Sequence, residues 1–380
     1  MKKVMLIFGT RPEAIKMCPV VKELAKYKEI KTVVCVTAQH REMLDQVLSL
    51  FNVVPDYDLN IMQEKQTLAD ITGKVLKGLA PVLDKEQPDL VLVHGDTTTT
   101  FAGALAAYYA KIPVGHVEAG LRTDNKYSPY PEEMNRRLTG ALCDLHFAPT
   151  GLAKEHLLRE NIKTESIMVT GNTVIDALRM TVKDGYQFTD KVLQRALDSG
   201  KKIILMTTHR RENLGEPLRQ VYKALKEVLH KHQDAMVIFP MHKNPAVRCV
   251  VEEELAGLEQ VVLVEPLDYE PFVNLMNKSF IILTDSGGIQ EEAPSLGKPV
   301  LVVRDVTERP EAVAAGTVRL VGTDYGKIVK ELSQLLDDEK YYRSMAEAIN
   351  PYGDGLASKR IVDKLLAYFG LSEQKLSEFI

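Results

Sequence analysis

The sequence lacks several features that mark specialised classes of protein. Its four cysteines are far apart and form no C-x-x-C pair, which argues against a disulfide framework and a zinc knuckle. The net charge is −4 at pH 7 and no run of lysine or arginine stands out, so no basic surface for nucleic acid is indicated. These absences favour a protein of the reducing cytoplasm that has no nucleic-acid partner.

Long hydrophobic runs are also missing. The apolar run near the N-terminus ends after five residues, at Gly9 and Arg11, and is too short for the core of a signal peptide. No later stretch is long enough to span a bilayer. We therefore predict a cytoplasmic protein without membrane contact, and we interpret the first apolar run as a β-strand.

Two nucleotide-binding fingerprints are absent as well. No G-x-G-x-x-G follows the first expected strand, and no G-x-x-x-x-G-K-[ST] occurs anywhere in the chain. The chain is therefore expected to be neither a dinucleotide oxidoreductase nor a P-loop NTPase.

What the chain does contain is a regular alternation of short apolar runs and amphipathic stretches. This alternation predicts parallel sheets with crossover helices, and 380 residues exceed what one hydrophobic core usually organises. We predict an α/β fold of two Rossmann-like domains with a ligand cleft between them, the boundary lying in the polar stretch 183–202. The expected strands are residues 4–8, 32–37, 90–94, 114–117, 145–147, 203–207, 236–240, 261–264, 280–283, 300–303 and 318–321.

One segment, residues 281–297, joins an apolar run, a glycine turn and a helix-compatible stretch. A strand that turns through glycines into a helix aims free backbone N–H groups at an anion. Ser286 is a candidate helix cap, and Gly287 and Gly288 allow a ligand to approach the backbone. Glu292 lies one turn beyond Gly288, within reach of hydroxyls beside a phosphate. The alternative is an ordinary strand-to-helix turn with a solvated pair of glutamates.

Ionisable side chains gather just after the expected strands, where open α/β sheets bind their ligands. Their shared position is stronger evidence for a site than any one of them. In the first half they are Arg11, Lys16, His94, Asp96, Glu118 and Arg122, and in the second half His209, Arg210, Arg211, Glu212, His242 and Lys243.

Two of these groups have other interpretations. His94 with Asp96, and His116 with Glu118, are i, i+2 pairs on a strand face and are possible metal ligands. However, no cysteine joins them, and a histidine in a strand is more often a core residue, so we predict no metal. The stretch 130–137 has an alternative interpretation as a helix that begins at a proline and carries solvated i, i+4 charge pairs.

Taken together, the motifs resemble the non-hydrolysing bacterial UDP-N-acetylglucosamine 2-epimerases. The resemblance extends through Arg309-Pro310-Glu311 and residues 350–355, and so covers nearly the whole chain. The segments that carry it are GTRPE at 9–13, HGDTTTT at 94–100, HVEAGLRT at 116–123, PEEMNRR at 131–137, HRREN at 209–213 and DSGGIQEEAPSLGKP at 285–299.

The resemblance implies a glycosyltransferase-B type fold. The first domain would be residues 1–182, with a C-terminal helix in residues 356–380 that packs back on it, and the UDP-binding domain would be residues 183–355. The implied reaction interconverts UDP-N-acetylglucosamine and UDP-N-acetylmannosamine without a cofactor, in a homodimer that serves cell-envelope polysaccharide synthesis. The alternatives are a UDP-sugar-dependent glycosyltransferase, a hydrolysing 2-epimerase, and a sensor that binds the nucleotide sugar without converting it.

Site residues follow from the same resemblance, motif by motif. Proton transfer at the sugar is assigned to three carboxylates, without a choice between base and acid. They are Asp96, Glu118 and Glu132, with His209, Lys16 and Arg136 as electrostatic partners at the leaving diphosphate. The residues implied for UDP are Arg11, Phe272, Ser286, Gly287, Gly288, Glu292 and Arg309.

A second, regulatory molecule of UDP-N-acetylglucosamine is a further implication of the resemblance. It would activate the reverse reaction from a place beside the active site. Glu42 and Lys65 stand where glutamine and arginine are expected, and lysine lacks the forked donors of arginine, which predicts weaker binding. The residues implied for this site are Gln39, His40, Gln66, Glu132, Arg211 and His242.

Overall fold

The computed structural model describes residues 1–38, 41–63 and 65–379. It divides into two compact units. Unit 1 comprises Met1–Met180 and Tyr352–Ile380, and unit 2 comprises Thr181–Pro351. The sequence placed these boundaries slightly later, after residues 182 and 355. Among the described residues, no helix is long and apolar enough to cross a membrane.

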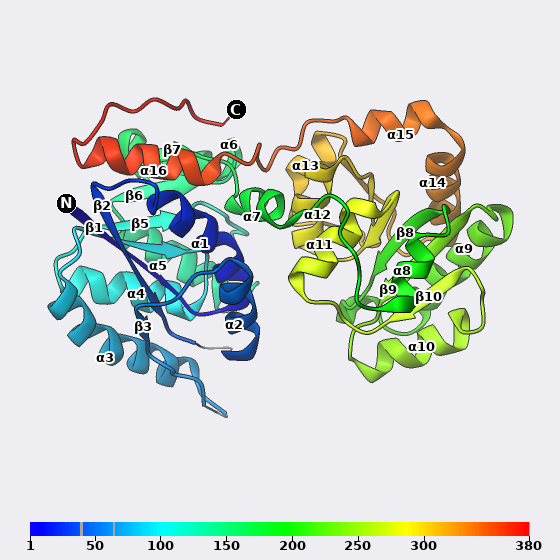
Figure 1. The fold of residues 1–380 in the computed structure, drawn as a ribbon, viewed down its shortest axis with the longest axis horizontal. Coiled ribbons are helices and arrows are strands. Elements are labelled where there is room, and N and C mark those ends of the chain that lie inside the picture. The colour runs from blue at the N-terminus through cyan, green and yellow to red at the C-terminus, as the bar shows by residue number, and fades with distance from the viewer. Residues whose placement is uncertain (39–40, 64, 380) are drawn as a thin grey trace. The chain divides into compact units, whose positions relative to one another are not determined.

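Unit 1 is built on a parallel sheet of seven strands in the order β3-β2-β1-β4-β5-β6-β7 (Figure 1). The sequence analysis missed β3 and β7, which have only two and three residues and therefore carry almost no hydrophobic pattern. The strands are β1 (Lys2–Phe8), β2 (Ile30–Val36), β3 (Tyr57–Asp58), β4 (Leu90–His94), β5 (Val114–Val117), β6 (Leu145–Ala148) and β7 (Ile167–Val169).

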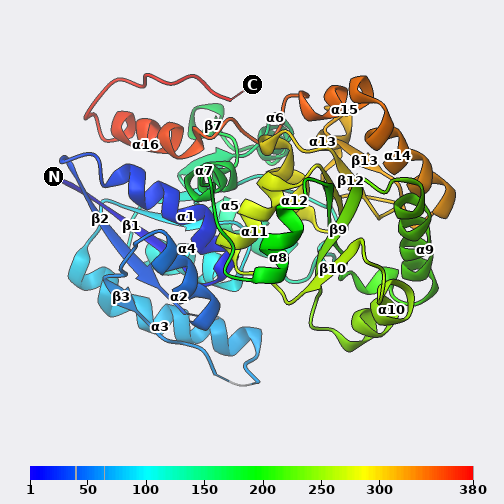
Figure 2. The same cartoon turned by 45° about the vertical axis from the view of Figure 1, so that its right-hand side comes forward.

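Helices cover both faces of this sheet, as parallel strands buried on two sides require. The C-terminal helix α16 packs on α1, and Figure 2 shows the two side by side. The helices are α1 (Arg11–Leu24), α2 (Arg41–Leu50), α3 (Leu68–Glu86), α4 (Thr98–Tyr109), α5 (Glu132–Leu142), α6 (Gly151–Arg159), α7 (Thr173–Thr181) and α16 (Ala357–Tyr368), with a 3₁₀ turn η1 (Thr164–Ser166).

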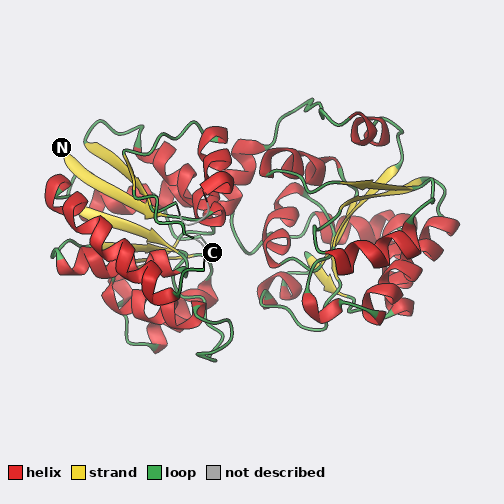
Figure 3. Ribbon diagram, turned by 90° about the horizontal axis from the view of Figure 1, so that it is seen from below, coloured by secondary structure: helices red, strands yellow, loops and turns green. Residues whose placement is uncertain are grey.

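Unit 2 repeats the plan with six parallel strands in the order β10-β9-β8-β11-β12-β13. Its strands are β8 (Lys202–Thr207), β9 (Ala235–Pro240), β10 (Val261–Val264), β11 (Ile281–Thr284), β12 (Val300–Val302) and β13 (Val318–Leu320). The helical segments are α8 (Lys191–Leu197), η2 (Arg211–Asn213), α9 (Glu216–Lys231), α10 (Pro245–Leu255), α11 (Tyr269–Lys278), α12 (Gly287–Glu292), η3 (Ala293–Leu296), α13 (Pro310–Ala314), α14 (Tyr325–Asp337) and α15 (Glu339–Ala346). Figure 3, coloured by secondary structure, shows each sheet in yellow between red helices.

Hydrophobic periodicity explains how the helices cover the sheets. In α9, Leu218, Val221, Leu225 and Val228 recur at three- and four-residue steps and are buried against the sheet of unit 2. The strands themselves are largely apolar, as in β4, where four apolar residues precede His94 and every residue is buried. The predicted α/β class with two parallel, Rossmann-like sheets is confirmed.

Both sheets reverse their winding direction at one point. The reversal lies between β1 and β4 in unit 1 and between β8 and β11 in unit 2. In open α/β sheets the ligand lies outside the carboxyl ends of the strands at this reversal. The loops after these four strands therefore define where each unit offers a site.

Candidate active site

In unit 1, the buried carboxylate of Glu13 ties together the loops that follow β1 and β4. One of its oxygens accepts hydrogen bonds from the N–H groups of Gly9 (2.9 Å) and Thr10 (2.7 Å), and the other accepts from the Thr97 hydroxyl (2.7 Å). Burial raises the pKa of Glu13, and these hydrogen bonds partly offset the rise. Glu13 thereby fixes the start of α1, which carries Arg11 and Lys16.

Glu118 follows β5 and is the centre of a cluster drawn from separate elements. Its Oε2 forms an ion pair with Lys16 of α1, accepts a hydrogen bond of 2.8 Å from Nδ2 of Asn172, and lies 3.8 Å from Nε2 of His94. The Glu118 backbone has a φ of +63°, in the left-handed region. Such a conformation costs about 1–3 kcal/mol and persists where the surroundings enforce it, often at functional sites.

His94 and His116 are core residues of the sheet. Nε2 of His116 lies 2.7 Å from the Gly95 carbonyl oxygen. Burial lowers the pKa of His94 to about 4 and that of His116 to about 3, so both rings are neutral at pH 7. Within the part of the chain that the structure describes, no group of three or more His, Cys, Asp or Glu side chains is placed to hold a metal ion.

These buried histidines predict that stability falls as the pH is lowered. The unfolded chain takes up protons near pH 6.5, whereas the folded rings resist protonation down to their lowered pKa values. Stability is therefore full above pH 6.5 and is lost as the pH falls toward 4. We expect a loss of about 2 kcal/mol per histidine between pH 7 and pH 5. Urea unfolding at the two pH values measures it, and His116→Gln should reduce the dependence. Equal stability at both pH values would contradict this expectation.

Asp96 follows β4 and is held by α5. Its Oδ2 accepts a hydrogen bond of 2.9 Å from Nε of Arg136, and its main-chain oxygen accepts one of 2.9 Å from Nδ2 of Asn135. Glu132 is the first residue of α5, the helix that also carries Asn135 and Arg136. The same helix therefore carries one of the predicted carboxylates, Glu132, and binds another, Asp96.

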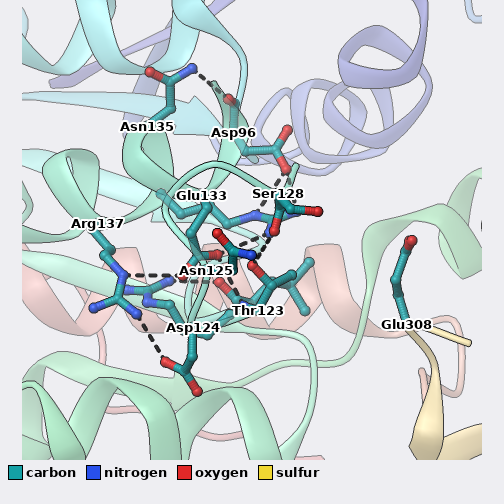
Figure 4. A network of polar contacts seen from close by, with 12 residues as sticks. Asp96, Thr123, Asp124, Asn125, Ser128, Glu133, Asn135, Arg137 and Glu308 are labelled. Atoms are coloured by element: carbon teal, nitrogen blue, oxygen red, sulfur yellow. Dashed lines mark hydrogen bonds and ion pairs between the residues drawn. The ribbon is translucent and has the colours of Figure 1, made fainter. Parts of the chain in front are cut away.

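Glu133, which the sequence analysis did not select, is the buried glutamate of α5. Its side chain is 0% exposed and pairs with Arg136 (3.3 Å) and Arg137 (3.1 Å). It also accepts a hydrogen bond of 3.0 Å from the N–H of Thr123. Figure 4 shows this network, in which Arg137 reaches on to Asp124. The i, i+4 pair formed here is thus Glu133–Arg137, and Arg136 turns to Asp96.

In unit 2, Asp285 links the loops after β8 and β11, the strands that flank the reversal. Its Oδ2 accepts hydrogen bonds of 2.8 Å from the N–H groups of His209 and Arg210, and its Oδ1 lies 2.9 Å from Nδ1 of His209. Burial opposes ionisation, but these hydrogen bonds outweigh it and lower the pKa of Asp285. The contact engages Nδ1 of His209 and leaves Nε2 for another partner.

The glycine segment forms the short helix α12, which continues as the 3₁₀ turn η3. The prediction that the Ser286 side chain caps this helix is wrong: Ser286 is at the cap position but makes no capping hydrogen bond, and its N–H donates to the Thr284 hydroxyl (3.0 Å). No atom lies within 4 Å of a Cβ built on Gly287, so the backbone is open there. Glu292 accepts a long hydrogen bond of 3.4 Å from the Tyr269 hydroxyl.

The other predicted nucleotide residues lie on three elements. Arg309 precedes α13 and forms an ion pair with Glu291, the neighbour of Glu292. Phe272 lies on α11 and is half-buried. Arg11, in unit 1, is the first residue of α1 and is also half-buried.

The predicted regulatory residues are less fully described. Gln39 and His40 lie outside the described residues, and Arg211 begins η2. Gln66 donates a hydrogen bond of 2.8 Å to the Ile61 carbonyl oxygen. His242 is exposed, and its ring stacks on that of His209 with 5.7 Å between centroids. Within unit 2, this proposed regulatory residue therefore touches a proposed catalytic one.

Comparison with known proteins gives a consistent result. The family model described as UDP-N-acetylglucosamine 2-epimerase matches residues 22–366. The UDP-N-acetylglucosamine 2-epimerase of Bacillus subtilis (strain 168) is 58% identical over 377 residues, which are 99% of this chain and 98% of that protein. The crystal structure of UDP-GlcNAc 2-epimerase from Neisseria meningitidis bound to UDP-GlcNAc is 54% identical with a TM-score of 0.83, covering 96% of this chain and 100% of that chain. The S. aureus MnaA–UDP structure is 52% identical with a TM-score of 0.89 and full coverage of both chains.

Proposed function

The chain belongs to the UDP-N-acetylglucosamine 2-epimerase family, and we propose that it inverts C2 of the sugar by eliminating UDP and adding it back. It is an isomerase that interconverts UDP-N-acetylglucosamine and UDP-N-acetylmannosamine. The observation that carries the proposed route is the composition of the two sites. Carboxylates with paired cations lie at the reversal of unit 1, and an open glycine segment beside a fixed histidine lies at the reversal of unit 2.

The glycine segment of unit 2 supports binding of UDP. The backbone at Gly287 is open, and we assign the diphosphate to Ser286, Gly287 and Gly288. Glu292 is one turn further on, and we assign its carboxylate to the ribose hydroxyls. Arg309 is oriented by Glu291 and adds a positive charge. Phe272 offers an aromatic ring to the uracil.

Replacement of Glu292 by alanine is expected to weaken UDP binding by about 1.5–3 kcal/mol, the usual effect of losing hydrogen bonds to a charged group. Titration calorimetry with UDP measures the change. Glu265→Ala is the control, because Glu265 pairs with Arg248 on the surface of the same unit and is exposed. Unchanged affinity in the Glu292 variant would move the nucleotide to another place.

The chemistry of the substrate explains why carboxylates are needed. The hydrogen on C2 is not next to a carbonyl group, so a base alone cannot remove it as a proton. If the C1–O bond to UDP breaks while a base takes this proton, the sugar becomes a glycal with a C1–C2 double bond. Protonation of C2 on the opposite face and return of UDP to C1 then give the epimer. Two faces of the sugar must be served, and we assign them to groups among Asp96, Glu118 and Glu132.

The remaining residues stabilise the charge that develops on the departing diphosphate. His209 contacts Asp285 through Nδ1, and in its protonated form it can donate from Nε2 to this charge, while the cations of Lys16 and Arg136 lie beside the carboxylates that they neutralise. Donors and cations that are fixed in advance favour the transition state without reorganisation.

Incubation of the protein with UDP-N-acetylglucosamine, followed by NMR of the products, tests this function. We expect a mixture of the two UDP-sugars and no free sugar. Release of free N-acetylmannosamine with UDP would identify a hydrolysing enzyme. Turnover only after addition of an acceptor would identify a glycosyltransferase. Binding of the UDP-sugar without any turnover would identify a sensor.

We further propose that the enzyme acts as a cytoplasmic homodimer that supplies N-acetylmannosamine units for cell-envelope polysaccharide. The second UDP-N-acetylglucosamine site, with Gln39, His40, Gln66, Arg211 and His242, remains part of this proposal. The stacking of His242 on His209 supports communication between a ligand at that site and the leaving diphosphate.

A further inference from the structure

Residues 350–355, Asn-Pro-Tyr-Gly-Asp-Gly, are a motif to which the proposed chemistry gives no task. The chain passes from unit 2 to unit 1 within this motif, after Pro351. On the unit 2 side, Nδ2 of Asn350 donates hydrogen bonds to the carbonyl oxygen of Glu291 (2.8 Å) and to the Ser295 hydroxyl (2.6 Å). Glu291 and Ser295 belong to the segment that begins at Gly287, so this segment holds the Asn350 end of the motif.

On the unit 1 side, the motif is held by Asn172. The N–H of Asn172 donates to the carbonyl oxygen of Tyr352 at 2.7 Å. A Cβ built on the preceding residue, Gly171, would lie 3.2 Å from Cα of Gly353, so glycine at 171 lets the two backbones approach this closely. Asp176 of α7 accepts hydrogen bonds from the N–H groups of Ala357 and Ser358 and fixes the chain just beyond the motif.

The side chain of Asn172 points to the proposed catalytic cluster. Its Oδ1 accepts a hydrogen bond from the N–H of Val174 (3.0 Å), which fixes the orientation of the amide. Its Nδ2 therefore faces Glu118 and donates to Oε2 at 2.8 Å. Asn172 is 3% exposed, so solvent does not compete for this contact.

Glu118 depends on such contacts because its backbone is in the left-handed region. The groups that face its carboxylate include three from described elements: Lys16 from α1, His94 from β4, and Asn172 before α7. Lys16 supplies charge on a flexible stem, and His94 lies 3.8 Å away, beyond hydrogen-bond distance. Asn172 is the rigid, neutral donor of the three.

We propose that Asn172 is a positioning residue for Glu118, and that the crossing segment 350–353 holds it in place. This inference rests on the proposed role of Glu118 in moving the C2 proton. The segment that joins the two units then also sets the direction of a carboxylate that acts on the sugar.

Two substitutions test the proposal. Asn172→Ala removes the donor, and a displacement of the carboxylate by about 1 Å is expected to lower kcat by about 10². KM and the affinity for UDP should stay within about twofold, because every residue that we assign to UDP except Arg11 lies in unit 2. Asn172→Asp keeps the shape and the acceptor for Val174. It should lose as much activity at pH 8 and recover part of it at pH 6, because the new carboxyl group, once protonated, can donate to Glu118 again.

Asn274→Ala is the matched control. Asn274 is 1% exposed, and its amide bonds to main-chain groups at Thr181, Lys183 and Glu270. Among the described residues, it bonds to no carboxylate. It should lose stability without the selective loss of kcat.

The proposal is overturned if Asn172→Ala retains kcat within about threefold of the wild type, if both alanine variants lose kcat in proportion to their melting temperatures, or if Asn172→Asp is equally impaired at both pH values. Should the alanine variant fail to fold, the aspartate variant carries the test. A wild-type protein without epimerase activity would instead refute the proposed function, which separates the two failures.

Discussion

Asp96→Asn is expected to lower kcat by about 10²–10⁴, the usual effect of removing a group that transfers a proton in the transition state. The substitution keeps the shape of the side chain, and the amide oxygen can still accept the hydrogen bond from Nε of Arg136. The fold of unit 1 and the affinity for UDP should therefore be preserved. If the variant still eliminates UDP but cannot protonate C2 of the glycal, it should also release UDP and the glycal. NMR of the reaction mixture detects both products.

The chain offers a matched control for this experiment in Asp89. It precedes β4, whereas Asp96 follows it, and it is also ion-paired, with Lys2 at 2.8 Å. Because Asp89 lies at the amino end of the sheet, Asp89→Asn should retain kcat. Equal activity of the two variants would show that Asp96 takes no part in proton transfer.

Glu133→Gln is expected to destabilise unit 1 by about 1.5–3 kcal/mol, because the variant loses charge-assisted hydrogen bonds in a buried place, while Arg136 and Arg137 keep their ion pairs with Asp96 and Asp124. The Glu133 carboxylate is fully buried and serves Arg136 and Arg137 together with the N–H of Thr123. Activity should fall as well, since Arg136 also holds Asp96. Urea unfolding followed by circular dichroism measures the change in the free energy of unfolding.

Glu155→Gln makes the same chemical change in an exposed pair. Glu155 and Arg159 lie 3.5 Å apart on the surface of α6, with side chains 62% and 69% exposed. Exposed pairs contribute about 0–1 kcal/mol, so this variant should unfold almost as the wild type does. A loss of similar size in both variants would mean that the network around Glu133 has no special role in stability.

The sequence predicted the edges of the sheets at which we place the candidate site, because the geometry of parallel strands decides that position. Residues that follow β1, β4 and β5 in unit 1, or β8 and β11 in unit 2, must meet at one edge once the apolar runs are strands. Pattern alone was sufficient for these strands because each is buried on both faces. It was insufficient for β3 and β7, which are too short to show a period.

The sequence could not decide which polar side chains hold the proposed catalytic side chains in place. Glu132 and Glu133 are neighbours with the same i, i+4 spacing to an arginine, and only the rotation of α5 against the sheet shows that Glu133 is the buried one. Glu13, Asp285 and Asn172 act through partners distant in the chain, as Asn172 does with Glu118, 54 positions away. The sequence offered a signal for the contact between Asn172 and the segment 350–355 in Gly171 and Gly353, since glycines in two distant motifs indicate a close approach of two backbones.

Turnover of UDP-N-acetylglucosamine in heavy water tests the central claim most directly. In elimination and re-addition the C2 hydrogen leaves carbon and passes to a side chain that exchanges with solvent, so deuterium should appear at C2 of the product. A transient oxidation or a ring-opening route forms no glycal and can return the original hydrogen. Product that carries only protium at C2 after full turnover, with no glycal from Asp96→Asn, would contradict elimination.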